Sequence, residues 1–318
     1  MKIYIPLACL ALTILAHAEP ADTNAKALPD WAIGPFTQAP EPVIKPNPDS
    51  VFHCPIQDKE INWEKSWVYN PAAVVRNGKI IVLYRAQQGP KNTCSRVGYA
   101  DSQDGSHFTR DPVPVFYPAN DDQKAVEWMK EEHRGCEDPR LAESQDGLYI
   151  LTYTQFSGKG FRLGIASSRD LKTWTKHGAL FAGTKWENSK VKSAAVVHEV
   201  KDGKLVAAKI NGKYWMYFGL GPVNLASSDD FIHWKPLEDD KGNMLIVMEP
   251  RSGFFDSVLT EIGPQSVLTK KGIVVFYNGK NANEKEEKNG DRKGDNSIPK
   301  GMYCGGQALF DAPPPPTT

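Results

Sequence analysis

The sequence predicts an all-β fold, a five-bladed β-propeller in which about four blades are visible and the last is incomplete. Two observations support this prediction: a short motif that recurs three times, and a hydrophobic strand that precedes each copy. The motif reads Ala-x-Ser-x-Asp-x-x-x-aromatic, and its copies begin at Ala100, Ala166 and Ala226. A β-sandwich would explain the strands but not the repeat. We therefore favour blades of four strands around a central channel.

The strand preceding each motif is rich in β-branched and aromatic residues, as expected of a sheet. Within the motif, the Ser and Asp side chains can bond their own backbone and start a turn, and the aromatic residue opens the next strand. In every unit a second strand lies before this one in the chain, and a glycine-containing turn connects the two, which predicts a hairpin. Four such strand pairs are expected, over residues 70–85, 137–154, 192–218 and 261–278.

Polar residues open all four of the predicted inner strands. In a propeller these strands line the channel and start at the same end of it, so their first side chains should meet in one pocket. A ligand site explains this recurrence better than four unrelated turns. Pro139 is expected to hold the residue before it in an extended conformation. The converging residues are Asn70, Glu137, Asp138, Arg140, Lys192 and Glu261.

The start of the chain predicts export. Residues 1–18 combine a lysine, a short apolar run and Ala16-His17-Ala18, which is typical of a secretory signal cleaved after Ala18. We therefore expect a secreted or periplasmic protein without membrane insertion, since no later run has the roughly 18 apolar residues of a membrane helix. The expected domains are the signal peptide, a catalytic propeller over residues 19–312 and a proline-rich tail over residues 313–318.

Charge and cysteine content narrow the function further. The 318 residues include 38 Lys and Arg and 38 Asp and Glu, a balance that does not favour nucleic acid as a partner. No CxxC or HExxH pattern occurs, so we expect neither a metal site nor a cofactor. Export would leave four cysteines in an oxidising compartment, where three pairings are possible. They are Cys54, Cys94, Cys136 and Cys304.

Six stretches, in order, resemble glycoside hydrolase family 130, whose members are five-bladed propellers that cleave β-mannosides with phosphate or water. The resemblance covers about residues 65–312. It implies that Asp138 is the catalytic acid, delivering a proton through a sugar hydroxyl while water or phosphate attacks the opposite face. The stretches are Tyr69-Asn-Pro-Ala, Leu83-Tyr-Arg-Ala86, Gly135-Cys-Glu-Asp-Pro-Arg140, Lys213-Tyr-Trp-Met-Tyr217, Ala226-Ser-Ser-Asp-Asp with Ile232-His-Trp234, and Phe255-Asp-Ser257 with Glu261-x-Gly-Pro264.

The last of these stretches is similar to the hydrolysing branch of the family, which implies an inverting β-mannosidase with Glu261 as general base. Asn278 stands in Tyr-Asn-Gly, where the phosphorylases have Tyr-His-Gly. A phosphorylase remains the alternative enzyme, and a glycosidase of the arabinan- and xylan-acting five-blade group ranks below it. The residues predicted to bind the β-mannoside are Asn70, Arg85, Glu137, Arg140, Lys192, Tyr217 and Asp256.

Two departures from the family pattern favour a further alternative, a carbohydrate-binding propeller without activity. Leu220 stands where the hydrolysing branch often has an acidic residue. After Phe310 the family continues into another blade, whereas this chain continues into four prolines, which cannot donate to a sheet. We therefore expect a C-terminally truncated member. Its ring is either closed by N-terminal strands between Trp31 and Phe52 or left open.

Overall fold

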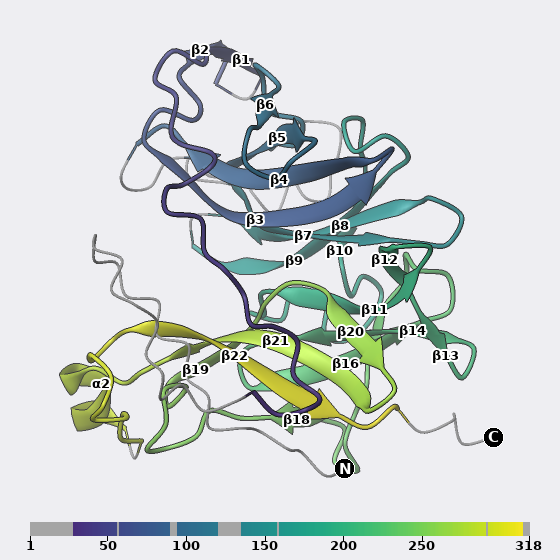
Figure 1. The fold of residues 1–318 in the computed structure, drawn as a ribbon, viewed down its shortest axis with the longest axis vertical. Coiled ribbons are helices and arrows are strands. Elements are labelled where there is room, and N and C mark those ends of the chain that lie inside the picture. The colour runs from purple at the N-terminus through teal and green to yellow at the C-terminus, as the bar shows by residue number, and fades with distance from the viewer. Residues whose placement is uncertain are drawn as a thin grey trace.

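The computed structural model describes residues 28–55, 57–89, 94–119, 135–157, 159–290 and 292–313. The predicted signal peptide, Arg134 and residues 314–318 lie outside this part. In the described residues almost all regular structure is β, and the one helix is α2 (Glu284–Asn289), so the all-β prediction is confirmed (Figure 1). No helix in these ranges is long and apolar enough to span a membrane.

Two separate antiparallel sheets of four strands form the first half of the fold, and in each the strands follow chain order. Their hairpins begin where glycine turns were predicted. The first sheet contains β3 (Trp67–Arg76), β4 (Lys79–Gln87), β5 (Arg96–Ser102) and β6 (Thr109–Arg110). The second contains β7 (Gly135–Glu143), β8 (Tyr149–Phe156), β9 (Phe161–Ser168) and β10 (Thr175–Ala179).

The third and fourth sheets are joined into one larger sheet by the parallel pairing of β11 with β20. The third contains β11 (Ala194–Lys201), β14 (Lys213–Phe218), β16 (Val223–Ser228) and β17 (Lys235–Pro236), with the short strands β12 (Lys204–Ala207), β13 (Lys209–Ile210) and β18 (Ile246–Met248). The fourth contains β19 (Leu259–Ile262), β20 (Ser266–Thr269), β21 (Gly272–Lys280) and β22 (Tyr303–Phe310), and β15 (Leu220–Gly221) pairs with β19.

The recurring motif forms the same turn in all three copies. The Oγ atoms of Ser102, Ser168 and Ser228 each accept a hydrogen bond from the backbone N–H three residues further on, at 2.8–2.9 Å. The Asp two residues later then accepts backbone N–H groups in its turn. The motif thus ends one strand and forms the turn that leads to the next, as predicted.

Four hydrophobic clusters form the core, and each is shared by neighbouring sheets. The four cysteines that follow the predicted signal peptide are all buried. Cys304 belongs to the cluster of the fourth sheet, whereas Cys54 and Cys136 belong to two other clusters. The sequence does not choose among their three possible pairings.

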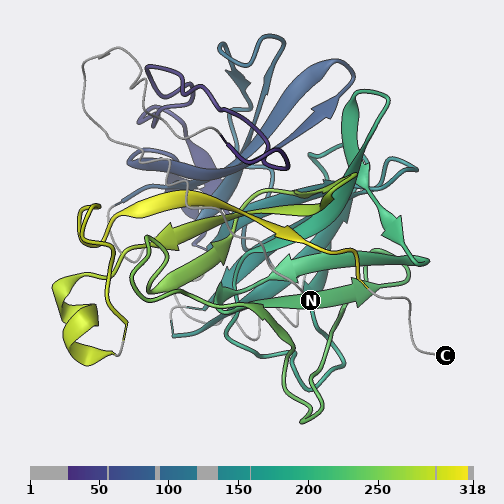
Figure 2. The same cartoon turned by 60° about the horizontal axis from the view of Figure 1, so that its bottom comes forward.

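In the part of the chain that the structure describes, the sheets do not close into a ring. Residues 28–51, which the structure describes in full, contain no strand. Of the two alternatives, closure by N-terminal strands is therefore wrong, and the open ring holds for the described residues. This segment instead crosses from the fourth sheet to the first as irregular chain, followed by the hairpin of β1 (Phe52–Cys54) and β2 (Lys59–Ile61) (Figures 1 and 2). The count of five blades stays a prediction.

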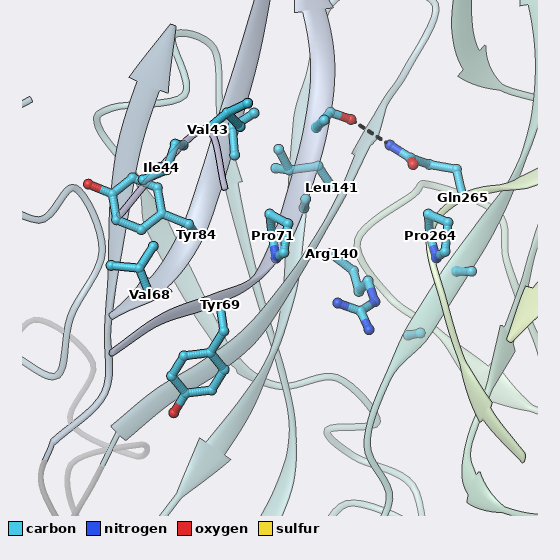
Figure 3. Close-up of a pocket in the computed structure, with 15 residues that line it drawn as sticks. Val43, Ile44, Val68, Tyr69, Pro71, Tyr84, Arg140, Leu141, Pro264 and Gln265 are labelled. Carbon is cyan, nitrogen blue, oxygen red and sulfur yellow. Dashed lines mark hydrogen bonds between the residues drawn. The ribbon is translucent and has the colours of Figure 1, made fainter. Parts of the chain in front are cut away.

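Residues of the four inner strands line a cavity of about 350 Å³, together with Val43, Ile44, Val82 and Tyr84 (Figure 3). Gln265 of the fourth sheet donates from Nε2 to the carbonyl of Ala73 in β3 at 3.0 Å, which links the last inner strand to the first. The walls are mostly apolar, with Arg140 as their charged side chain. The lining includes Tyr69, Pro71, Ala72, Ala73, Arg140, Leu141, Ala194, Ala195, Pro264 and Gln265.

Candidate active site

Backbone irregularities at the start of three inner strands place the site. The pairing register breaks at Asn70 in β3 and at Asp138 in β7, as in a β-bulge. Asn70, Asp138 and Ser193, the residue before β11, have φ values of 46°, 50° and 52°. These values lie in the left-handed region, which costs free energy for any residue other than glycine.

The prediction that Pro139 keeps Asp138 extended is therefore wrong. The steric rule for residues before proline is outweighed here, because the bulge requires a left-handed residue and Asp tolerates this conformation better than most. The side chain also gains a partner by it: Asn70 Nδ2 donates to Asp138 Oδ1 at 2.6 Å.

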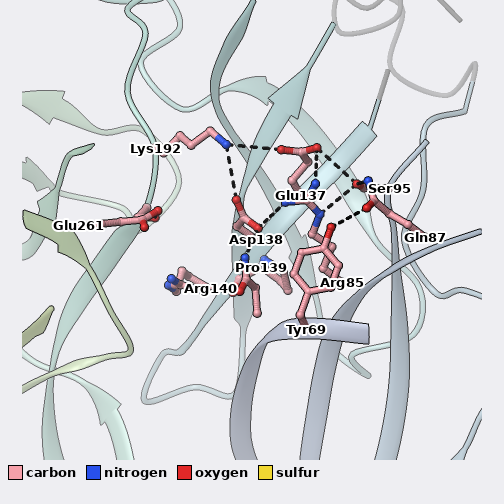
Figure 4. Close-up of polar contacts among 12 residues, drawn as sticks. Tyr69, Arg85, Gln87, Ser95, Glu137, Asp138, Pro139, Arg140, Lys192 and Glu261 are labelled. Carbon is pink, nitrogen blue, oxygen red and sulfur yellow. Dashed lines mark hydrogen bonds and ion pairs between the residues drawn. The ribbon is translucent and has the colours of Figure 1, made fainter. Parts of the chain in front are cut away.

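Two cations and two carboxylates form the centre of the site (Figure 4). Arg85, from β4, donates from Nη1 to Asp138 Oδ1 at 2.8 Å and from Nη2 to Glu137 Oε1 at 2.6 Å. Lys192 Nζ lies 3.4 Å from Glu137 Oε2 and 3.6 Å from Asp138 Oδ2. Both carboxylate side chains are buried, with exposed fractions of 8% for Glu137 and 5% for Asp138. Charges removed from water to this extent need such partners.

The same cations set the protonation of Asp138. Burial by itself would raise the pKa of this carboxyl group, but Arg85, Lys192 and the amide of Asn70 outweigh burial and hold the pKa below its usual range. Asp138 is therefore a carboxylate at neutral pH in the unliganded protein. To act as an acid it must first gain a proton.

Glu261, from β19, lies near this cluster. Ser193 Oγ donates to Glu261 Oε1 at 2.8 Å, and the neighbouring residue Lys192 contacts Asp138. Two adjacent residues thus each contact one of the predicted catalytic carboxylates, Lys192 that of Asp138 and Ser193 that of Glu261. In the antiparallel ladder, Leu220 of β15 lies directly opposite Glu261.

Arg140 lies near enough to both carboxylates for their charges to act on its guanidinium. Burial lowers the pKa of its guanidinium, and the opposing charges of Asp138 and Glu261 do not fully offset this effect. Its hydrogen bonds go to backbone carbonyls, from Nη1 to Pro139 at 3.1 Å and from Nη2 to Ile262 at 3.3 Å. Arg140 lines the cavity between the inner strands, whereas Asp138 and Glu261 do not. It thus stands between the apolar cavity and the carboxylates.

Two of the predicted binding residues are placed differently. Tyr217 is buried in the core and packs against the ring of Phe310, with 5.0 Å between centroids. Asp256 is fully buried, and it accepts hydrogen bonds from Tyr277 Oη at 2.9 Å and from Arg251 Nε at 3.0 Å. The structure does not bring either side chain into the cluster with the other predicted residues. The residues it brings together are Asn70, Arg85, Glu137, Asp138, Arg140, Lys192 and Glu261.

Four further side chains take part in the site and were not singled out from the sequence. Ser95 Oγ accepts hydrogen bonds from Arg85 Nε at 3.0 Å and from Gln87 Nε2 at 2.9 Å, and lies 3.3 Å from Glu137 Oε1. Tyr69 donates from Oη to Gln87 Oε1 at 2.6 Å, and its ring lies under Arg85, 4.8 Å from the centroid to Cζ. The fourth is Ser193, which follows Lys192 and could have been found by aligning the inner strands.

Fold and site together define an all-β, propeller-like protein with carboxylates gathered where its inner strands begin. Glycoside cleavage uses a pair of carboxyl groups. The sequence model of glycoside hydrolase family 130, described as beta-1,4-mannooligosaccharide phosphorylase, matches residues 41–291. This protein therefore belongs to glycoside hydrolase family 130.

Its relatives include both phosphorylases and glycosidases. The 1,2-beta-oligomannan phosphorylase of Thermoanaerobacter sp. (strain X514) is 31% identical over 70% of this chain and 68% of its own. A structure of a putative glycosidase from Bacteroides thetaiotaomicron is 48% identical with a TM-score of 0.79, covering 86% of this chain and 77% of its own. Another structure is 45% identical with a TM-score of 0.82, covering 90% and 79%. It was reported with the statement that the family contains glycoside hydrolases that target beta-1,2 mannosidic linkages in Candida mannan.

Proposed function

We propose that this protein is an exported β-mannosidase that hydrolyses β-1,2-mannosidic linkages with inversion, with Asp138 as general acid and Glu261 as general base. The observation that carries the proposal is the dipeptide Lys192-Ser193, whose side chains contact Asp138 at 3.6 Å and Glu261 at 2.8 Å. An acid and a base on opposite faces of a sugar are what inverting hydrolysis requires. The 45% identical relative supports the choice of linkage.

The remaining residues of the cluster have binding roles in this proposal. Arg85 and Glu137 present polar groups for sugar hydroxyls, and Asn70 orients Asp138. The proton on Asp138 passes to the glycosidic oxygen through a hydroxyl of the bound mannose, as the family resemblance implies. We also infer that the four sheets are blades of a five-bladed propeller, since each begins its inner strand at the same site.

Release of mannose from β-1,2-mannobiose and β-1,4-mannobiose, with and without inorganic phosphate, tests the proposal. Hydrolysis predicts free mannose at the same rate in both buffers, with β-1,2-mannobiose preferred. Mannose 1-phosphate formed only with phosphate would contradict it. This second outcome is the alternative function, a phosphorylase, which is favoured by the cations Arg85, Lys192 and Arg140 near the carboxylates and by two phosphorylase relatives at 31% and 30% identity.

The non-catalytic alternative is favoured by Leu220. Its side chain stands opposite Glu261 and cannot take a proton from water. An increase in melting temperature with mannobiose, in the absence of any product, would identify the protein as a binding module rather than an enzyme.

A further inference from the structure

Two side chains at corresponding places in the fold each hold one carboxylate of the site. Asn70 Nδ2 donates to Asp138 Oδ1 at 2.6 Å, and Ser193 Oγ donates to Glu261 Oε1 at 2.8 Å. Each donor lies at the start of an inner strand, in the first and third sheets, and each carboxylate lies on the inner strand of the sheet that follows. Both pairs are 68 residues apart in the chain. The same arrangement is thus built twice.

The backbone at both donors supports a specific role. Asn70 and Ser193 have φ values of 46° and 52°, in the left-handed region. A glycine would adopt this conformation without strain, whereas a serine with its Cβ does not. Ser193 is also buried, with 1% of its surface exposed, so its hydroxyl needs a partner inside the protein. Glu261 is that partner.

We infer that Ser193 is a positioning residue that fixes the carboxylate of Glu261, as Asn70 fixes that of Asp138. The inference rests on the proposed function, in which Glu261 activates water. Leu220, opposite Glu261 in the ladder, has no hydrogen-bond donor in its side chain, and Ser193 Oγ supplies a hydrogen bond that orients the carboxylate. A base that is free to rotate would lose its alignment with the water and the sugar.

Hydrolysis of β-1,2-mannobiose by Ser193→Ala and Ser193→Gly tests the inference. Both variants lack the hydroxyl, but only glycine relieves the backbone. If the hydroxyl is what matters, both lower kcat by about tenfold to a hundredfold with little change in KM. Asp202→Gly is the matched control, because Asp202 has a φ of 50° in a turn outside the site, and it should leave kcat unchanged. A loss of kcat in the alanine variant alone would assign the effect to strain and overturn the inference.

A double-mutant cycle with Glu261→Gln separates this inference from the proposed function. If Ser193 acts through Glu261, adding Ser193→Gly to Glu261→Gln costs no further activity. If the two losses instead multiply, Ser193 does not act through Glu261, and the base role of Glu261 stands alone. If Glu261→Gln is as active as the wild-type protein, or if the wild-type protein releases no mannose, the proposed function fails, and the inference fails with it.

Discussion

At the scale of single residues, the site depends on the carboxylate of Asp138, which forms ion pairs with two cations in the unliganded protein. Arg85 and Lys192 both contact Asp138, and the amide of Asn70 adds a hydrogen bond. Such pairing stabilises the ionised form. An acid that starts as a carboxylate must take up its proton when the sugar binds or from an acidic medium.

The role of the Asp138 side chain can be tested by a substitution of the same size. Asp138→Asn keeps the size of the group and its hydrogen bond to Asn70 but cannot deliver a proton. We expect kcat to fall by about 10²- to 10⁴-fold, the range attributed to general acid catalysis, while mannobiose still binds. Turnover assays and calorimetric titration measure the two effects separately. Asp202→Asn, in an exposed turn, serves as the control. Equal turnover in the Asp138→Asn variant and the wild-type protein would exclude Asp138 as the acid.

The lowered pKa of Asp138 also predicts how the activity depends on pH. Because the pKa of Asp138 is held below its usual range, its protonated fraction falls as the pH rises, and kcat/KM should decline on the alkaline side of an acidic optimum. Lys192→Gln removes one of the charges that lower this pKa. The declining limb should therefore move to higher pH in this variant, even where the maximum rate is reduced. An unmoved limb would show that another group controls it.

At the scale of elements, the short pairing of β15 with β19 places Leu220 opposite Glu261. Directly opposed residues in an antiparallel ladder have Cβ atoms about 4.5–5.5 Å apart, so a carboxylate at position 220 could share a water molecule with Glu261. If hydrolysis uses two carboxylates there, Leu220→Asp should raise kcat by about tenfold or more in the mannobiose assay. Leu220→Asn, of the same size but uncharged, should give no gain. A higher kcat in both variants would show that a polar side chain at position 220 is sufficient and that a second carboxylate is not needed.

Another element, β11, contains a histidine that the site does not use. His198 is buried, and burial lowers its pKa to about 4, although the carbonyl of Val196 accepts from its Nδ1 at 2.7 Å. The folded protein therefore keeps this side chain neutral in a range where the unfolded chain, with a pKa of about 6.5, is protonated. The free energy of unfolding should fall between about pH 6.5 and 4, by up to about 3 kcal/mol from this group.

Urea titrations across this range measure the effect. His198→Leu removes the titrating group, and His233→Leu, at an exposed turn, is the control that leaves the buried group in place. The stability of the His198→Leu variant should depend less steeply on pH between 6.5 and 4 than that of the control. Parallel curves for the two variants would mean that His198 is protonated in the folded protein.

The same elements show what the sequence can predict. Because each inner strand begins one repeat unit, Asn70, Asp138, Lys192 and Glu261 could be brought together by alignment alone. Tyr217 could not be placed, since a strand pattern does not tell which aromatic side chain packs in the core. The local rule for Pro139 failed because the bulge, a feature of strand pairing, decides the conformation of Asp138. Ser95 reaches Glu137 from a different sheet, and no spacing in the sequence indicates that contact.

At the scale of the whole molecule, the open side of the fold is spanned by residues 28–51. Near its start this segment is bound by Gln307 of β22, whose side chain accepts from Ile33 N at 2.9 Å and donates to Ile33 O at 2.8 Å. The amide of Gln307 thus replaces the missing pairing of a strand. Phe36 adds an edge-on contact with Phe276, with 6.0 Å between centroids. Further along, Arg110 of the first sheet donates to the carbonyl of Lys45 at 2.6 Å.

This geometry predicts that the segment stabilises the fold by linking its two ends. Gln307→Leu keeps the volume but leaves both backbone groups of Ile33 without their partner, which should lower the free energy of unfolding by about 1–3 kcal/mol. Lys271→Ala is the matched control, because its ion pair with Asp30 tethers the same segment but is exposed at both ends, and such pairs contribute at most about 1 kcal/mol. Urea titration measures the stabilities, and limited proteolysis should cleave the Gln307→Leu variant first within residues 28–51. Should Gln307→Leu cost no more than Lys271→Ala, with unchanged proteolysis, the segment only covers the open side and does not hold the first and fourth sheets together.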